Sequence, residues 1–349
     1  MEGESKGTVC VTGGTGFVAS WLIKRLLQQG YSVNTTVRSS PQGVGLGEIS
    51  EFSISSSFVQ YYSKEKTSYL TSLPGASERL RIFQADLDKP GSFDSAIKGC
   101  IGVFHVAHPI DLTEKETAEM KINKSISGTL GILQACLDSK TVKRVVYTSS
   151  AATVVDHNKD LDVVDENLWT DVDYVRRSID NNFAVSYITA KTLTERAALE
   201  FAEKHSLDLV TVIPTWIHGP FICSRLPGSV SSSLAMIIGN QNVLKYTEII
   251  SFVHTDDVAN AHIFLFECPN AKGRYICSAV EITVDNLAKF LSTRYPEFQI
   301  RNEEDLIERG RKLSGMSSKK LLDTGFRYKY GLEEMFDEAI QCCREKGFL

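Results

Sequence analysis

Excess positive charge is missing from this chain. Among its 349 residues, 38 Lys and Arg stand against 43 Asp and Glu, which gives a net charge of −5. Without a basic surface, nucleic acid is not expected as a partner. No apolar run approaches the ~20 residues that a membrane-spanning helix needs, so no membrane span is predicted. The N-terminal segment MEGESKG is polar and has no apolar signal core, which predicts a cytoplasmic protein.

Cysteine patterns typical of metal or disulfide sites are also missing. The eight cysteines are scattered, and none forms a C-x-x-C pair or a Cys/His cluster with zinc-like spacing. Cys342 and Cys343 are neighbours in a helical pattern and cannot easily bond to each other there. We therefore predict reduced thiols in the core or at the surface, and no metal site.

What the chain does contain is an alternation of β-rich runs with amphipathic segments, beginning at residue 7. This alternation is typical of a parallel sheet covered by helices, and the nearly continuous apolar runs fit strands buried on both faces. The predicted fold class is α/β, with a doubly wound Rossmann sheet. The predicted strands span residues 7–12, 32–38, 80–87, 102–107, 144–149 and 208–214, and the predicted helices span residues 17–29, 114–139 and 183–205.

The regular alternation weakens after residue 214, which predicts a second, smaller part of the chain. Residues 1–215 are predicted to form an NADP-binding Rossmann domain. Residues 216–349 are predicted to form mainly a mostly helical substrate-binding lobe. Within it, residues 254–280 should supply a helix and a strand that pack back on the sheet, and residues 331–346 should be helical.

One segment does not fit this pattern. Residues 39–63 are rich in Gly and Ser and weakly patterned, at a place where a short connection is normal. Two interpretations stay open for this atypical insertion: a flexible flap over the cofactor, or an inert insertion.

A Gly-rich turn, in the segment VTGGTGFVA, joins the first predicted strand to the first predicted helix. Gly13, Gly16 and Ala19 match the G-x-x-G-x-x-G/A spacing of dinucleotide-binding turns. A turn without side chains lets backbone N–H groups approach a pyrophosphate, and the helix N-terminus adds its partial positive charge. We therefore predict cofactor contacts at Gly13 and Gly16 and at Phe17 and Val18, which open the helix.

The residue that ends the second strand bears on the choice of cofactor. An NAD site would place Asp or Glu there, whereas this chain has Arg38. A guanidinium suits a 2′-phosphate through charge-assisted hydrogen bonds, so NADPH is predicted as the cofactor. The alternative is a solvated arginine at the end of a strand.

Two further strand ends are expected to line the cofactor, since ligands of open α/β sheets bind at the carboxyl ends of the strands. Asp86 and Leu87 end the third predicted strand and are placed to meet the adenine. Val106, Ala107 and His108 lie at the end of the fourth predicted strand and should line the trench beside the cofactor.

Three residues form the predicted catalytic set. Tyr187 and Lys191 stand at i and i+4 on one predicted helix, so both face the same side. A nearby ammonium should stabilise tyrosinate and lower the pKa of Tyr187 from its usual value near ~10 toward the working range of a general acid. Ser150 closes the fifth strand, and its hydroxyl can hydrogen-bond the substrate carbonyl oxygen as negative charge develops there.

Five segments of the chain together carry a family resemblance. They are VCVTGGTGF, GVFHVA, KTVKR, VHTDDV and the ending KGFL, at residues 9–17, 102–107, 140–144, 253–258 and 346–349. With these segments the chain resembles the extended short-chain dehydrogenase/reductases. Within them it is similar to the plant group of dihydroflavonol, anthocyanidin, vestitone and cinnamoyl-CoA reductases. The resemblance covers nearly the whole chain apart from residues 39–63.

The resemblance implies further cofactor contacts. Pro214 and Thr215 should border the nicotinamide, and Lys66 should join Arg38 at the 2′-phosphate. The set of predicted cofactor contacts also includes Tyr187 and Lys191, together with Thr148, Ile217 and Ser229.

The chain also departs from the group's pattern. Dihydroflavonol reductases usually place Asn five residues after the catalytic serine, where this chain has Val155, which puts a dihydroflavonol substrate in doubt. The segment NFAVSY before the catalytic pair differs from the NWYCY signature of cinnamoyl-CoA reductases and argues against a CoA thioester. His108 replaces a small residue and either hydrogen-bonds the substrate or fills space. The predicted substrate contacts are His108, Ser150, Val155 and Tyr187.

Three hypotheses for function follow. The first is an NADPH-dependent reductase of a small carbonyl compound, monomeric or weakly dimeric. The second is a sugar-nucleotide epimerase or dehydratase that retains NAD; Arg38 and the apolar stretch around Trp216 and Phe221 argue against it. The third is a non-catalytic dinucleotide-binding protein, against which the complete catalytic set argues.

Overall fold

The computed structural model describes residues 6–38, 67–109, 117–159, 161–239, 248–300 and 314–349. Three sequence predictions concern residues outside these ranges: the insertion at 39–63, the cofactor contact Lys66, and the start of a helix at residue 114.

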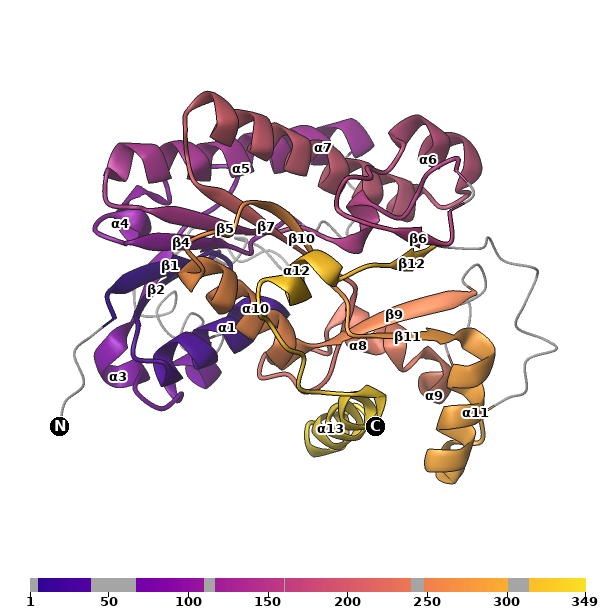
Figure 1. Ribbon diagram of the computed structural model, residues 1–349. Coiled ribbons are helices and arrows are strands. Elements are labelled where there is room, and N and C mark those ends of the chain that lie inside the picture. The colour runs from indigo at the N-terminus through magenta and orange to yellow at the C-terminus, as the bar shows by residue number, and fades with distance from the viewer. Residues whose placement is uncertain (1–5, 39–66, 110–116, 160, 240–247, 301–313) are drawn as a thin grey trace, which may run out of the picture.

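A seven-stranded sheet lies at the centre, in the order β10-β7-β5-β4-β1-β2-β3, and all its neighbouring strands are parallel (Figure 1). This order confirms the predicted doubly wound Rossmann fold. Strand β1 pairs with β2 on one side and β4 on the other, so the direction of winding reverses there and creates the crevice in which such folds bind ligands. The strands are β1 (Thr8–Val11), β2 (Ser32–Val37), β3 (Leu80–Gln84), β4 (Gly102–His105), β5 (Arg144–Thr148), β7 (Leu209–Pro214) and β10 (Gly273–Cys277).

Helices cover both faces of this sheet (Figure 1). On one face, α5 (Ala118–Ser139) and α7 (Asn182–Lys204) pack side by side. On the other face, α1 (Phe17–Gln28) packs against α10 (Thr255–Glu267). Because both faces are covered, the inner strands are buried on both sides, whereas β3 at the edge is partly exposed.

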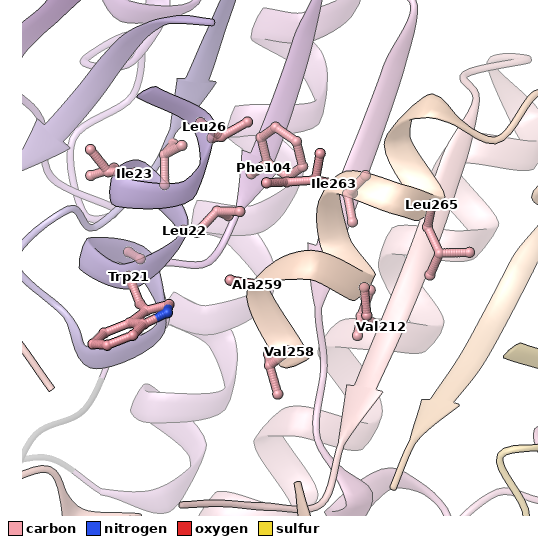
Figure 2. Close-up of a cluster of buried hydrophobic side chains, with 14 of the residues drawn as sticks. Trp21, Leu22, Ile23, Leu26, Phe104, Val212, Val258, Ala259, Ile263 and Leu265 are labelled. Atoms are coloured by element: carbon pink, nitrogen blue, oxygen red, sulfur yellow. The ribbon is translucent and has the colours of Figure 1, made fainter. Parts of the chain in front are cut away.

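The core between α1, α10 and the sheet combines apolar packing with one buried carboxylate. Leu22 of α1, Phe104 of β4 and Ile263 of α10 are almost completely shielded from solvent and meet in one cluster (Figure 2). At its edge, the guanidinium of Arg25 forms two hydrogen bonds to the carboxylate of Asp256, which opens α10. These contacts tie the first helix of the chain to a helix more than 200 residues away.

The smaller lobe contains a sheet that the sequence did not predict. Strands β8 (Trp216–His218), β9 (Ile249–His254) and β11 (Val280–Thr283) form it, so the prediction of a mostly helical lobe was incomplete. Each strand is short and finds its partner far away in the chain, a pairing that local periodicity does not reveal. The helices of the lobe are α8 (Gly228–Ser233), α9 (Ala235–Ile238), α11 (Val284–Arg294) and α13 (Leu332–Glu345).

The two parts of the chain are interleaved. Helix α10 contacts β5 and β7, and β10 extends the main sheet beyond β7. A small parallel pair, β6 (Val163–Val164) and β12 (Gly315–Met316), joins the segment after β5 to the C-terminal region. The other short elements are α3 (Ala76–Arg79), α4 (Asp94–Ile97), η1 (Ala151–Thr153), α6 (Val172–Ser178), η3 (Pro296–Phe298) and α12 (Lys319–Asp323).

Two smaller predictions can be compared with the structure. All eight cysteines are free thiols, and all but Cys268 are buried, as the scattered pattern predicted. Among the helices in the described ranges, none is both long and apolar enough to cross a membrane.

Candidate dinucleotide and catalytic site

The turn between β1 and α1 has no room for a side chain at Gly13 or Gly14. Gly13 has a positive φ of 74°, and a Cβ on it would lie 3.1 Å from the Ala107 backbone. A Cβ on Gly14 would overlap the hydroxyl of Thr35. Gly16 donates its N–H to the Gly13 carbonyl at 2.8 Å, which closes the turn. The sequence predicted Gly13 and Gly16 but not Gly14, whose neighbour Thr35 belongs to another strand.

The start of α1 supplies the donors for an anion. The N–H groups of Gly13 and Gly14 are already bonded to Thr36, so they do not point outward. The first N–H groups of an α-helix have no partner within the helix, and here they belong to Phe17 and Val18. The first turn of α1 carries no acidic residue that would repel a phosphate. The cradle therefore fits the pyrophosphate of a dinucleotide.

A buried polar network fixes the two strand ends beside this turn. The hydroxyl of Thr12 accepts the N–H groups of Val106 and Ala107 at 3.0 and 2.9 Å and contacts Nδ1 of His105 at 3.1 Å. His105 also contacts the Thr129 hydroxyl on α5 at 3.0 Å. Burial lowers the pKa of His105 to about 3, so the ring is neutral and acts as a structural bridge. Sequence reasoning missed this network, since a histidine within an apolar strand gives no sign of its partners.

The strand ends predicted to meet the adenosine half lie at the same edge of the sheet. Arg38 is exposed directly after β2. Asp86 and Leu87 are half-buried after β3, where the Ser92 hydroxyl exchanges hydrogen bonds with the Asp86 backbone. Leu87 packs closely against Gly128 of α5. A Cβ on Gly128 would lie 2.9 Å from the Cβ of Leu87.

The structure brings the three predicted catalytic residues together. Ser150 is the second residue after β5, and Tyr187 and Lys191 lie one turn apart on α7. The hydroxyl of Tyr187 donates to the Ser150 hydroxyl at 3.4 Å. The ammonium of Lys191 donates to the carbonyl of Thr148 at 3.2 Å, and only 5% of this lysine is exposed. All three groups therefore meet beyond the carboxyl end of β5.

The electrostatics of Tyr187 differ from the sequence prediction. Burial raises the pKa of Tyr187, and the hydrogen bond with Ser150 only partly offsets this effect. The predicted lowering of this pKa was wrong, because the cost of burying a phenolate outweighs the lowering by the hydrogen bond with Ser150. Burial lowers the pKa of Lys191 to about 8, against an opposing influence of Glu195. At neutral pH Tyr187 is thus a protonated phenol, and Lys191, one turn further along α7, is an ammonium.

Behind the catalytic residues lies a buried ion pair. Glu195 of α7 is fully buried and accepts from Arg274 of β10 at 2.8 Å and from the Ser149 hydroxyl at 2.5 Å. Arg274 also donates to the Thr153 hydroxyl at 2.9 Å and lies 3.6 Å from the centre of the Trp169 ring. The pair ties the catalytic helix to the chain on both sides of Ser150. Only an arginine in an apolar strand and a glutamate four residues after Lys191 could have drawn attention to it.

The remaining predicted contacts lie around this centre. The hydroxyl of Thr148 is bonded to His262 of α10 at 2.8 Å, so only the backbone of Thr148 faces Lys191. Pro214 ends β7, and the N–H of Thr215 donates to the Cys277 carbonyl at 3.1 Å. The other three predicted residues are partly exposed and lie after η1, in β8 and in α8: Val155, Ile217 and Ser229.

His108 stands next to the catalytic tyrosine. Its ring lies edge-to-face with that of Tyr187, with centroids 5.9 Å apart, and its Nδ1 lies 3.3 Å from the Ser125 hydroxyl. Burial, followed by the charge of Lys191, lowers the pKa of His108 well below its usual value, so the ring is neutral. The structure thus brings the predicted His108, Tyr187 and Ser150 into one neighbourhood.

Known proteins resemble this chain over nearly its whole length. A model of the NAD dependent epimerase/dehydratase family matches residues 9–277. Vestitone reductase of Medicago sativa is 46% identical over 99% of both chains, and its crystal structure superposes with a TM-score of 0.82. The Protein BRI1-5 ENHANCED 1 of Arabidopsis thaliana is 48% identical, and dihydroflavonol 4-reductase of Zea mays 45%; each match covers 99% of this chain and 91% of the relative.

These matches agree with the geometry of the Gly-rich turn and of the catalytic residues. The chain therefore belongs to the NAD dependent epimerase/dehydratase family, among the extended short-chain dehydrogenase/reductases that include the vestitone and dihydroflavonol reductases.

Proposed function

We propose that the protein is an NADPH-dependent reductase that converts the ketone of a small aromatic or specialised metabolite, vestitone- or flavonoid-like, to an alcohol. The observation that carries this proposal is the meeting of the Tyr187 and Ser150 hydroxyls beside the buried Lys191 ammonium. Relatives matched over nearly their whole length are named vestitone reductase and dihydroflavonol 4-reductase, so the chain is an oxidoreductase acting on carbonyl groups.

The chemistry divides simply between the cofactor and the chain. Bound NADPH supplies the hydride for the carbonyl carbon. The hydroxyls of Ser150 and Tyr187 hydrogen-bond the carbonyl oxygen and stabilise the negative charge that develops there. Tyr187 then gives its proton to that oxygen. Its raised pKa keeps the phenol protonated and does not hinder the transfer, because an alkoxide is a far stronger base than a phenolate.

Lys191 has two roles in this proposal. Its positive charge favours the tyrosinate that forms when the proton leaves, and its ammonium would hold the nicotinamide ribose hydroxyls. The bond to the Thr148 carbonyl keeps the long side chain in one position next to the reacting groups. Glu195, one further turn along α7, favours the charged form of Lys191.

The preference for NADPH over NADH rests on the second strand. The matching family is described as NAD dependent, but the side chain at the critical strand end of this chain is the exposed Arg38. An arginine there attracts a 2′-phosphate, whereas a carboxylate would repel it. A cytoplasmic enzyme, monomeric or weakly dimeric, stays the prediction from the sequence.

The test compares the wild-type protein with Tyr187→Phe. We expect the wild type to oxidise NADPH in the presence of a suitable aromatic ketone, and the variant to lose activity by about 10²–10⁴-fold, the usual contribution of a general acid. NADPH binding, measured by calorimetry, should persist. Tyr295→Phe is the matched control, because it removes a phenol hydroxyl that is bonded to Asp337 in the smaller lobe.

Other outcomes would point elsewhere. Undiminished turnover by Tyr187→Phe would contradict the assignment of the general acid. Tightly retained NAD with no net oxidation of NADPH would favour the epimerase or dehydratase. NADPH binding without turnover of any carbonyl compound would favour a non-catalytic protein.

A further inference from the structure

Three hydrogen-bonding side chains form a line from α7 to the end of β4. The hydroxyl of Thr194 donates to that of Ser125 at 2.9 Å, and the Ser125 hydroxyl lies 3.3 Å from Nδ1 of His108. Thr194 is fully buried and Ser125 is 1% exposed. Water is therefore not available to these hydroxyls, and each hydrogen must find its acceptor inside the protein.

This line determines which ring nitrogen of His108 carries the proton. The Ser125 oxygen accepts from Thr194, and among the described residues the Ser125 hydroxyl has no further partner besides Nδ1. A hydroxyl has one hydrogen, which Ser125 uses by donating to Nδ1. Because the ring is neutral, a Nδ1 that accepts leaves the proton on Nε2.

The Nε2–H group belongs to a ring that packs edge-to-face against the ring of Tyr187. No hydrogen bond within the described part of the chain uses Nε2, and the atom is not among the enclosed polar atoms that lack a partner. The atom is therefore not completely shielded from solvent, and it lies on a ring that stands at 88° to the Tyr187 ring. Val155, another side chain predicted at the substrate, is apolar and cannot donate a hydrogen bond.

We propose that His108 is a specificity-determining residue, which donates its Nε2–H to a second oxygen of the substrate, close to the carbonyl that is reduced. The proposal rests on the reductase function given above. The substrate class it selects is a ketone with a hydroxyl, alkoxy or ring oxygen near the carbonyl, since a lone N–H needs an acceptor. The bonds to Ser125 and Thr194 position this donor, and a ring that only filled space would not need them.

The experiment uses a pair of small aromatic ketones that differ by one hydroxyl next to the carbonyl, α-hydroxyacetophenone and acetophenone. The wild type should prefer the hydroxylated ketone by about tenfold in kcat/KM, as a hydrogen bond made only with that substrate is worth roughly such a factor. In His108→Phe, which keeps a ring of similar shape, the ratio should fall to about one. His108→Gln keeps an N–H donor and should restore part of the preference.

The line of hydrogen bonds from Thr194 through Ser125 to His108 is tested by Ser125→Ala, a change at a residue that does not contact the substrate. Without the Ser125 hydroxyl, His108 can also carry its proton on Nδ1, and Nε2 then no longer donates. The preference for the hydroxylated ketone in kcat/KM should therefore fall by about two- to threefold. Ser127→Ala, whose hydroxyl bonds the Lys124 carbonyl at an exposed position of α5, is the control and should leave the ratio unchanged.

A second readout separates the proposal from the reductase function. The two dissociation constants are measured by calorimetry with NADP⁺ bound, which requires no turnover. A preference in binding without reduction of either ketone would uphold the role of His108 and count against the reductase. Equal binding of the two ketones to the wild type, or an unchanged ratio in His108→Phe, would overturn the role of His108.

Discussion

Replacing Glu195 by Gln should destabilise the protein strongly, although the side chain keeps its size. Glu195 is fully buried, and its partner Arg274 is 6% exposed. The substitution leaves the guanidinium charge of Arg274 in the interior without a counter-charge. Breaking a buried pair from one side typically costs about 3–5 kcal/mol, because the remaining charge stays desolvated. The neutral partners of Arg274, the Thr153 hydroxyl and the backbone carbonyls of Glu166 and Leu168, cannot offset this loss.

The loss is measured as the change in the free energy of unfolding in urea, followed by tryptophan fluorescence. The control is Asp323→Asn, which breaks an ion pair with Lys319 whose two side chains are 61% and 77% exposed. Exposed pairs contribute little, so the control should lose about 0.5 kcal/mol or less. If Glu195→Gln and Asp323→Asn lowered the free energy of unfolding by equally small amounts, the assignment of a tightly coupled buried pair would be refuted.

A double-variant cycle sharpens this test. Arg274→Met alone leaves the Glu195 carboxylate buried without its counter-charge and should be about as destabilising as Glu195→Gln. The double variant Glu195→Gln/Arg274→Met buries no unpaired charge and should be more stable than the sum of the single losses predicts, by roughly 1–3 kcal/mol. Strict additivity would mean that the two side chains do not stabilise one another.

Two further predictions concern pH and the cofactor. Because burial lowers the pKa of Lys191 to about 8, the ammonium is lost at lower pH than in an ordinary lysine, so kcat/KM for ketone reduction should be level below pH 8 and fall above it. Lys191→Arg should move the fall to higher pH, and a level profile of the wild type up to pH 10 would argue against a role of this charge. Arg38→Ala should raise KM for NADPH by about tenfold or more and leave KM for NADH nearly unchanged, compared with Arg81→Ala on the exposed edge strand as control. Equal effects on both cofactors would show that Arg38 does not bind the 2′-phosphate.

The features that the sequence predicted well are those encoded by local spacing. The Gly13 turn requires a positive φ, and its position between a strand and a helix is visible without a structure. Tyr187 and Lys191 share a helix face because they are four residues apart. The buried strands of the main sheet are continuous apolar runs, and their order follows from the doubly wound pattern.

The features that stayed hidden depend on contacts between distant residues. Arg274 and Glu195 are 79 residues apart, and no periodicity joins them. Strand β8 has three residues and exists because it pairs with β9. The pKa of Tyr187 followed burial, which the spacing to Lys191 could not reveal. Likewise, the tautomer inferred for His108 depends on hydroxyls from α5 and α7.

Transfer of a labelled hydride tests the central claim most directly, namely that this site reduces a carbonyl compound at the expense of NADPH. NADPH deuterated on the transferring face is incubated with the protein and an aromatic ketone, and the products are analysed by mass spectrometry. The account predicts one deuterium on the carbinol carbon of the alcohol and a stoichiometric amount of NADP⁺. A product without deuterium, or a label that stays on the cofactor while the substrate isomerises, would contradict it.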